Sequence, residues 1–170
     1  QKKLILKHIS TRGYYMGSHL YQLYLQFLIY ELNDEEKKIF LENYIEMVKE
    51  ASKIDADSTK YESYGIGTED TPIFPDMHEA SASLVGGTLT AVDYVMEGKS
   101  THAVNLGGGL HHGFKGRASG FCIYNDSSVA IKYMQEKYNA RVLYIDTDAH
   151  HGDGVQWSFY DDPNVCTISI

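Results

Sequence analysis

Three carboxylates and two imidazoles lie within the eight residues from Asp146 to Asp153. In an extended segment, side chains two positions apart point to the same side, so Asp148 and His150 can address one metal ion together. One oxygen ligand and one nitrogen ligand suit zinc or another borderline divalent ion. Aspartate and glycine are also common in turns, but the additional His151 and Asp153 favour a metal site over a turn network.

A second polar cluster follows a run of three glycines, residues 107–109, and contains the adjacent histidines His111 and His112. The chemistry that such a pair suits is metal-assisted hydrolysis, in which a metal lowers the pKa of a bound water and an imidazole takes or returns a proton. Catalytic imidazoles are usually oriented by a carboxylate on the far ring nitrogen. Asp146 and Asp153 are the carboxylates that could serve the two histidines in this way.

Helices and short strands must position these clusters. Helical spacing of apolar residues is present in three segments, residues 34–54, 77–97 and about 127–138. We expect Asp76 to cap the start of the second helix and Gly98 its end. Asp126 is expected to cap the third helix, which should stop near Asn139.

Short buried strands are expected between the helices, at residues 102–106, 141–145 and 165–170, and a polar loop at residues 55–74. Strands that alternate with helices indicate an α/β fold with a mainly parallel sheet. Ligands in such sheets bind beyond the carboxyl ends of the strands. Both polar clusters follow predicted strands directly, so the pattern places a site there.

Composition narrows the class of protein. The 170 residues are 43% hydrophobic and 22% charged, with a net charge of -8, which is typical of one globular domain. No run of lysine and arginine predicts nucleic-acid binding, and no apolar stretch approaches the roughly 20 residues that cross a membrane. Cys122 and Cys166 both lie in apolar strings, which suits reduced, buried thiols in a cytoplasmic protein.

Two long motifs resemble those of the histone deacetylase family. Residues 105–126 read NLGGGLHHGFKGRASGFCIYND, similar to the family's histidine-pair motif, and residues 143–165 read LYIDTDAHHGDGVQWSFYDDPNV, similar to its metal loop. Residues 64–98, YGIGTEDTPIFPDMHEASASLVGGTLTAVDYVMEG, are similar to the bacterial acetoin-utilization deacetylases within that family. The resemblance implies a three-layer αβα fold of the arginase/deacetylase type.

The resemblance also implies roles for individual residues. His111 and His112 match the catalytic pair, and Asp146 and Asp153 match the carboxylates behind the first and second histidine. Gly120, Phe121 and Asp70 match substrate-binding positions: the first two the wall of the acetyl-lysine tunnel, the last the rim aspartate that grips the substrate backbone.

Metal positions carry over in the same way. Asp148 and His150 match two of the three ligands of a zinc ion, or of another divalent ion in its place. The family also binds a structural potassium ion beside this loop. The positions that match its ligands are Asp146, Asp148, His150, Ser169 and Ile170.

The chain departs from the family's pattern at both ends. The third zinc ligand, an aspartate, and the tyrosine that polarises the acetyl carbonyl belong downstream of Ile170, so two of three expected protein ligands are present. Residues 1–41 match the family poorly and residues 42–170 match it well. We therefore expect residues 1–170 to form a single, C-terminally incomplete deacetylase domain that is inactive by itself.

The resemblance implies a zinc-dependent lysine deacetylase that hydrolyses N6-acetyl-lysine on proteins, with metal-activated water and the histidine pair as acid and base. It also implies a link to acetoin catabolism, through protein acetylation rather than acetoin chemistry.

Two alternatives differ in class. A ureohydrolase of the arginase type would hold two manganese ions with an Asp-Ala-His-x-Asp pattern, but Gly152 stands where its last aspartate belongs. The other alternative is a non-catalytic protein, either an acetyl-lysine binder or an inactive fragment. The complete set of two histidines and two carboxylates argues against a long-standing loss of activity, whereas the missing downstream ligands favour inactivity of this particular chain.

Overall fold

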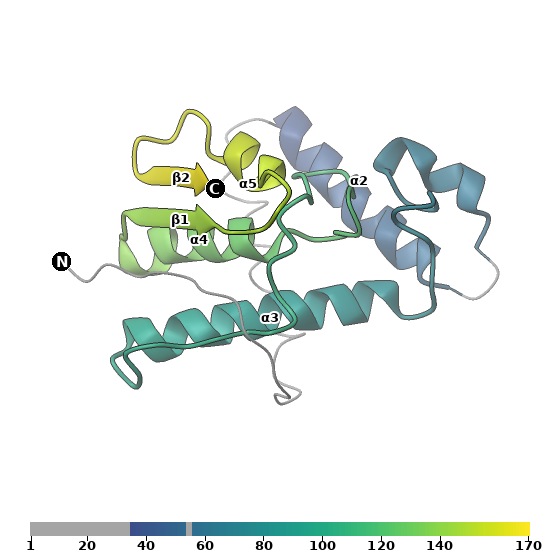
Figure 1. Ribbon diagram of the computed structural model, residues 1–170. Helices are drawn as coiled ribbons and strands as arrows, with labels where there is room; N and C mark the ends of the chain where they lie inside the picture. The colour runs from purple at the N-terminus through teal and green to yellow at the C-terminus, as the bar shows by residue number, and fades with distance from the viewer. Residues whose placement is uncertain (1–34, 54–55) are drawn as a thin grey trace.

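The computed structural model describes residues 35–53 and 56–170, which form an α/β arrangement (Figure 1). The elements are, in order, α2 (Glu35–Ala51), the 3-10 helix η1 (Ser58–Tyr64), α3 (Met77–Met96), α4 (Asp126–Tyr138), β1 (Val142–Asp146), α5 (Asp153–Ser158) and β2 (Val165–Ser169). Residues 1–34, which include most of the segment expected to match the family poorly, lie outside the described residues.

The two strands β1 and β2 pair in parallel, with Val142 opposite Val165 and Asp146 opposite Ser169. A parallel pair needs a crossover connection, and here α5 lies within it. The register brings the last residues of both strands to one end of the sheet, where the loop that follows Asp146 begins (Figure 1). The predicted α/β class with parallel strands is therefore confirmed.

Helices cover the sheet in successive layers. In Figure 1, α4 lies along β1, and α3 runs beside α4 on the side away from the strands. Fully buried side chains join α3 to α4, among them Val85 and Leu89 from α3 and Ile131 and Met134 from α4. Each such side chain contributes roughly 1.5–3 kcal/mol when it leaves water, so this interface holds the elements that carry the site.

Two of the predicted helix caps are wrong in detail. Asp76 precedes α3 in a left-handed conformation, and its side chain makes no capping hydrogen bond. Asp126 is the first residue of α4 rather than its cap, because the side chain of Asn125 accepts the hydrogen bond from Ser128 N. At the other ends, Gly98 follows α3 with a φ of 75° and Asn139 ends α4 with a φ of 49°, as the sequence predicts.

The predicted strand at residues 102–106 is not a strand in the structure. A strand needs a hydrogen-bonded neighbour, and in the part of the chain that the structure describes only β1 and β2 pair. The segment is held through a side chain instead: Asn105 Nδ2 donates to Leu84 O and to Thr88 Oγ1, both on α3. The glycine run and histidine pair that follow are thus attached to α3.

Burial along the last strand also differs from the prediction. Cys166 and Ile168 of β2 are exposed, although their apolar surroundings predicted a buried strand. Among the described residues, β2 pairs with β1 alone, so its other edge has no neighbour.

The predicted loop at residues 55–74 contains η1, whose cap, Asp57, accepts from Thr59 N. None of the helices formed by residues 35–53 and 56–170 has the length and apolar character to cross a membrane.

Candidate active site

His111 and Asp146 form a buried pair between the histidine loop and the end of β1. His111 Nδ1 lies 2.6 Å from Asp146 Oδ2, and both side chains are almost inaccessible to solvent. The same carboxylate oxygen accepts a hydrogen bond from Tyr144 OH at 2.7 Å, while Oδ1 accepts from Asp148 N at 3.0 Å. Asp146 therefore links the histidine loop, β1 and the metal loop.

The environment of Asp146 keeps its carboxylate ionised. Burial alone would raise the pKa, but the hydrogen bonds from Tyr144 and His111 outweigh it and hold the pKa below its usual range. Burial and the adjacent Asp146 carboxylate raise the pKa of Tyr144, so its hydroxyl remains a donor. An ionised carboxylate only accepts hydrogen bonds, so His111 carries its proton on Nδ1 and leaves Nε2 for reaction.

His112 and Asp153 form the second pair, with Nδ1 and Oδ1 2.7 Å apart. Asp153 is the first residue of α5, and its Oδ1 also accepts from Gly154 N at 2.8 Å. The two histidine rings lie 4.0 Å apart between centroids and are inclined by 46°. Two adjacent imidazoles, each with a carboxylate on Nδ1, are arranged to take and return protons through their other nitrogens.

The loop that carries the histidines is held by side chains at the start of α4. Asn125 Nδ2 donates to His111 O at 3.2 Å and to Gly113 O at 2.9 Å. Asp126, which is 1% exposed, accepts from Leu110 N at 2.8 Å and from Thr88 Oγ1 at 2.6 Å. Because these contacts satisfy the loop's polar backbone inside the protein, they fix its course beside α4.

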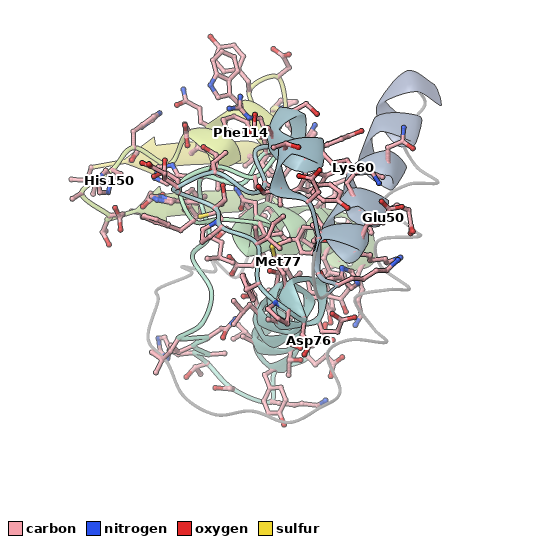
Figure 2. The ribbon with its side chains drawn as sticks, turned by 90° about the vertical axis from the view of Figure 1, so that its right-hand side faces the viewer. Glu50, Lys60, Asp76, Met77, Phe114 and His150 are labelled. Atoms are coloured by element: carbon pink, nitrogen blue, oxygen red, sulfur yellow. The ribbon has the colours of Figure 1, made fainter. Side chains whose placement is uncertain are left out.

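Asp148 and His150 lie beside the histidine pair and are exposed, with 53% and 79% of their side chains accessible. Asp148 Oδ1 lies 3.1 Å from His150 Nδ1, and the His150 ring centroid is 6.0 Å from that of His112. Figure 2 shows His150 at the outer edge of the molecule, on the side opposite Glu50 and Lys60. The backbone N–H of His150 lowers the pKa of Asp148, which keeps the carboxylate charged.

This pair fits two corners of a zinc site. Tetrahedral zinc with oxygen and nitrogen ligands at about 2.0–2.2 Å separates neighbouring donors by about 3.3–3.6 Å, a few tenths of an ångström more than the 3.1 Å between Asp148 Oδ1 and His150 Nδ1. Residues 35–53 and 56–170 contain no group of three side chains able to hold a metal. Asp148 and His150 therefore lie side by side as expected, without a third candidate ligand among the described residues.

The residues predicted to hold potassium come together at the carboxyl end of the sheet. Ser169 lies opposite Asp146 in the strand register, and Ile170 N donates to Asp146 O at 3.1 Å. Ser169 Oγ accepts from Gly152 N at 3.2 Å, which joins β2 to the metal loop. Their role as potassium ligands remains a prediction.

The predicted tunnel residues Gly120 and Phe121 form the tip of a tight turn. A Cβ on Gly120 would overlap the ring of His112, so the turn packs directly on the candidate catalytic histidine. Phe121 is 76% exposed beside it. Asp70 is exposed in the loop after η1, whereas the carboxylates that pair with the two histidines are those of Asp146 and Asp153.

The sequence interpretation missed several residues that support the site. Tyr144 could have been found, because it lies two positions before Asp146 on a strand and therefore on the same face. Asp126 was expected only to cap a helix and Asn125 was not singled out, so neither contact with the histidine loop was predicted. Thr88 carried no signal, since its contact with Asp126 depends on how α3 packs against α4.

Comparisons with known proteins place this fold and site in a family. Residues 18–170 match the histone deacetylase domain, and the chain belongs to that family. Among its relatives, the acetoin utilization protein AcuC of Bacillus subtilis is 66% identical over 137 residues, 81% of this chain and 35% of that protein. AcuC of Staphylococcus aureus strain MW2 is 50% identical over 138 residues, 81% of this chain and 36% of that protein.

Solved structures agree with this assignment. A histone deacetylase homologue from Aquifex aeolicus superposes with a TM-score of 0.69 at 32% identity, over 88% of this chain and 43% of that one. A structure of a histone deacetylase homologue in complex with SAHA gives the same values. The arginase/deacetylase-like fold is therefore confirmed. The chain spans about a third of the length of the curated relatives that it matches.

Proposed function

We propose that the protein containing this chain is a metal-dependent lysine deacetylase that acts on acetylated proteins. The observation that carries the proposal is the adjacent pair His111 and His112, each with a carboxylate on Nδ1 and both beside Asp148 and His150. Family membership supports the reaction class. The names of the relatives support a role in acetoin utilization, which we assign to control of protein acetylation.

The protein groups divide the work of amide hydrolysis. Asp148 and His150 would hold a zinc ion, which when bound supplies positive charge to the acetyl carbonyl and lowers the pKa of water at the site. His112 Nε2 takes a proton from the attacking water, and the histidine pair returns a proton to the departing lysine nitrogen. Asp146 and Asp153 hold the two rings in the tautomer that this transfer requires.

Substrate contacts and a structural ion complete the proposal. Gly120 and Phe121 would flank the aliphatic stem of acetyl-lysine, and Asp70 would accept hydrogen bonds from the substrate backbone. Potassium would lie among oxygen atoms of Asp146, Asp148, His150, Ser169 and Ile170 and stabilise the metal loop.

Gly152 supports one divalent ion over two. A two-manganese site of the ureohydrolase kind would need a carboxylate at this position. A Cβ on Gly152 would overlap the carboxylate of Asp146, so a side chain cannot be added there without disturbing the His111 pair.

Replacement of His112 tests the proposal. In the complete protein, His112→Ala should reduce kcat on an acetyl-lysine peptide by at least ~10²-fold, the usual contribution of general acid–base catalysis. Metal analysis should find one divalent ion per chain, and the isolated 170-residue chain, with two donors, should bind zinc weakly and show no turnover. Unchanged activity in the variant would refute the assignment, and two tightly bound manganese ions would favour the ureohydrolase alternative.

A further inference from the structure

The turn at Ser119–Cys122 has an unusual backbone. Ser119 and Cys122 exchange backbone hydrogen bonds, with N–O distances of 3.1 and 2.8 Å, and the two residues between them have φ values of 50° for Gly120 and 67° for Phe121. Positive φ at both central positions is typical of a tight hairpin turn. A bulky residue such as phenylalanine rarely adopts it and keeps it only where the surroundings hold the chain there.

The side chain of Phe121 does not provide that hold, because 76% of it is exposed. The restraint must come from the residues that flank the turn. Before the turn, Ala118 N donates to Tyr64 O at 2.9 Å, which attaches this side to the end of η1. After the turn, two further contacts come from helices that are distant in sequence.

Tyr44 of α2 and His78 of α3 hold the residues directly after the turn. Tyr44 OH donates to Ile123 O at 2.6 Å, and His78 Nδ1 forms a hydrogen bond with Tyr124 OH at 2.9 Å. The ring of Tyr124 meets those of Tyr44 and His78 edge-on, at centroid distances of 6.0 and 5.9 Å. All four residues are buried, so the contacts are shielded from water.

Movement of the Ser119–Cys122 turn would change the surroundings of His112 in the candidate active site. Gly120 packs on His112 without room for a Cβ. Phe121 lies next to Gly120, and its exposed side chain is the Phe121 wall, the surface proposed above to flank acetyl-lysine. A shift that relaxed the φ of Phe121 would therefore also change the space beside His112. Sub-ångström to ångström displacements of this kind are enough to weaken substrate positioning.

We propose that Tyr44 and His78 are positioning residues for substrate, which act by holding the Ser119–Cys122 turn and thereby the Phe121 wall. The inference rests on the proposed deacetylase function. Neither residue touches the reacting atoms. The alternative is that both merely belong to the core, in which case their loss would lower stability without a selective effect on the turn or on substrate binding.

Matched variants of the complete protein separate these alternatives. His78→Phe and Tyr44→Phe keep an aromatic ring and remove the hydrogen bond to Tyr124 OH and to Ile123 O, respectively, and His78→Asn restores a polar atom near the position of Nδ1. Tyr133→Phe is the control, because Tyr133 is also buried and its OH donates to Asp93 Oδ1 at 2.8 Å, between α3 and α4. The measurements are KM and kcat on an acetyl-lysine peptide, and amide hydrogen exchange across residues 118–125.

The proposal expects KM to rise about 3- to 10-fold in His78→Phe and Tyr44→Phe with kcat changed less, the range that loss of one buried hydrogen bond implies. Exchange of the Ser119 and Cys122 amides should accelerate by about 10-fold while helix amides keep their rates. His78→Asn should recover most of both effects, and Tyr133→Phe should show neither.

A double variant tests the route through Phe121. In a Phe121→Ala background, His78→Phe should raise KM by less than about 2-fold further, because the wall that it positions is already gone. Full additivity, unchanged exchange in the turn, or faster exchange with unchanged KM would each overturn the proposal. An inactive wild-type protein would instead contradict the proposed function, and the exchange experiment would still decide whether His78 and Tyr44 hold the turn.

Discussion

The contact between His112 and Asp153 places a carboxylate on Nδ1 of the candidate base while the imidazole stays accessible to solvent. His112 remains partly accessible, whereas Asp153 is fixed by Gly154 N at the start of α5. An ionised carboxylate can only accept a hydrogen bond, so it selects the tautomer in which His112 Nδ1 is protonated. A neutral amide in its place could present either an oxygen or an N–H to the ring, and the selection would be lost.

Asp153→Asn should therefore lower kcat by about 10- to 100-fold with little change in KM or melting temperature, the usual cost of losing a partner that orients a functional imidazole. Steady-state kinetics and thermal unfolding of the complete protein provide the measurement. Asp161→Asn is the control, because Asp161 is exposed in the loop that follows α5. Wild-type kcat in Asp153→Asn would show that the contact does not orient the base.

At the scale of elements, the start of α4 has two tasks. Asn125 Oδ1 accepts from Ser128 N at 2.8 Å and caps the helix, while its Nδ2 donates to His111 O and Gly113 O. The buried side chain of Asn125 thus binds the loop that carries the histidine pair and also caps α4, the helix that packs against β1. The loop cannot shift along α4 without breaking these hydrogen bonds.

Asn125→Ala should lower the free energy of unfolding by about 2–4 kcal/mol, since it removes a helix cap and leaves two buried carbonyls without this donor. Denaturant unfolding measures the change. Ser128→Ala is the matched control three positions later, because the Ser128 hydroxyl is buried without a hydrogen-bond partner among the described residues and its removal should cost little. Equal losses in the two variants would contradict the double role of Asn125.

Local sequence signals predicted the elements whose formation depends on local contacts. The helix expected at residues 77–97 is α3, because apolar residues such as Val85, Leu89 and Val92 recur on one face and Gly98 can adopt a positive φ. The strand expected at residues 102–106 failed because a strand is defined by a neighbour, and composition does not name the neighbour. For the same reason the buried strand expected after Val165 is an exposed one.

The candidate site divides in a similar way. Spacing suggested that Asp148 and His150 share a side and that Asp146 and Asp153 serve the histidines, and these contacts are present although the catalytic roles remain predictions. The contacts of Thr88 with Asp126 and of His78 with Tyr124 span 38 and 46 positions and follow only from helix packing. No local pattern distinguishes them from ordinary polar residues on a helix.

At the scale of the whole molecule, His78 lies where α2, α3 and the segment after the turn meet, so its ionisation affects the assembled fold. Burial lowers the pKa of His78. Nearby charges have smaller effects: Glu79 and Glu46 raise the pKa and Lys49 lowers it, and the net direction stays downward. The unfolded chain, with an ordinary histidine pKa of about 6.5, therefore binds a proton at higher pH than the folded chain does. Below that pH the unfolded state binds more protons, and stability falls.

The free energy of unfolding should thus be fully retained above about pH 6.5 and decline as the pH is lowered toward the depressed pKa of His78. Denaturant unfolding of the complete protein between about pH 7.5 and 5 measures the decline. His78→Phe lacks the group and should show a shallower slope over the same interval, although it starts from a lower stability. Parallel curves for wild type and variant would assign the pH dependence to other groups.

An exposed aromatic pair joins α5 to the turn after it: Trp157 of α5 is 64% exposed and stacks on Tyr160, with ring centroids 5.4 Å apart. Trp157 is also the single tryptophan of the sequence. In the 170-residue chain, its fluorescence therefore reports on one place only, the short helix α5, whose first residue, Asp153, contacts His112. Quenching and polarisation of this emission would follow changes at α5 in the unlabelled 170-residue chain, because selective excitation of the indole avoids the tyrosines.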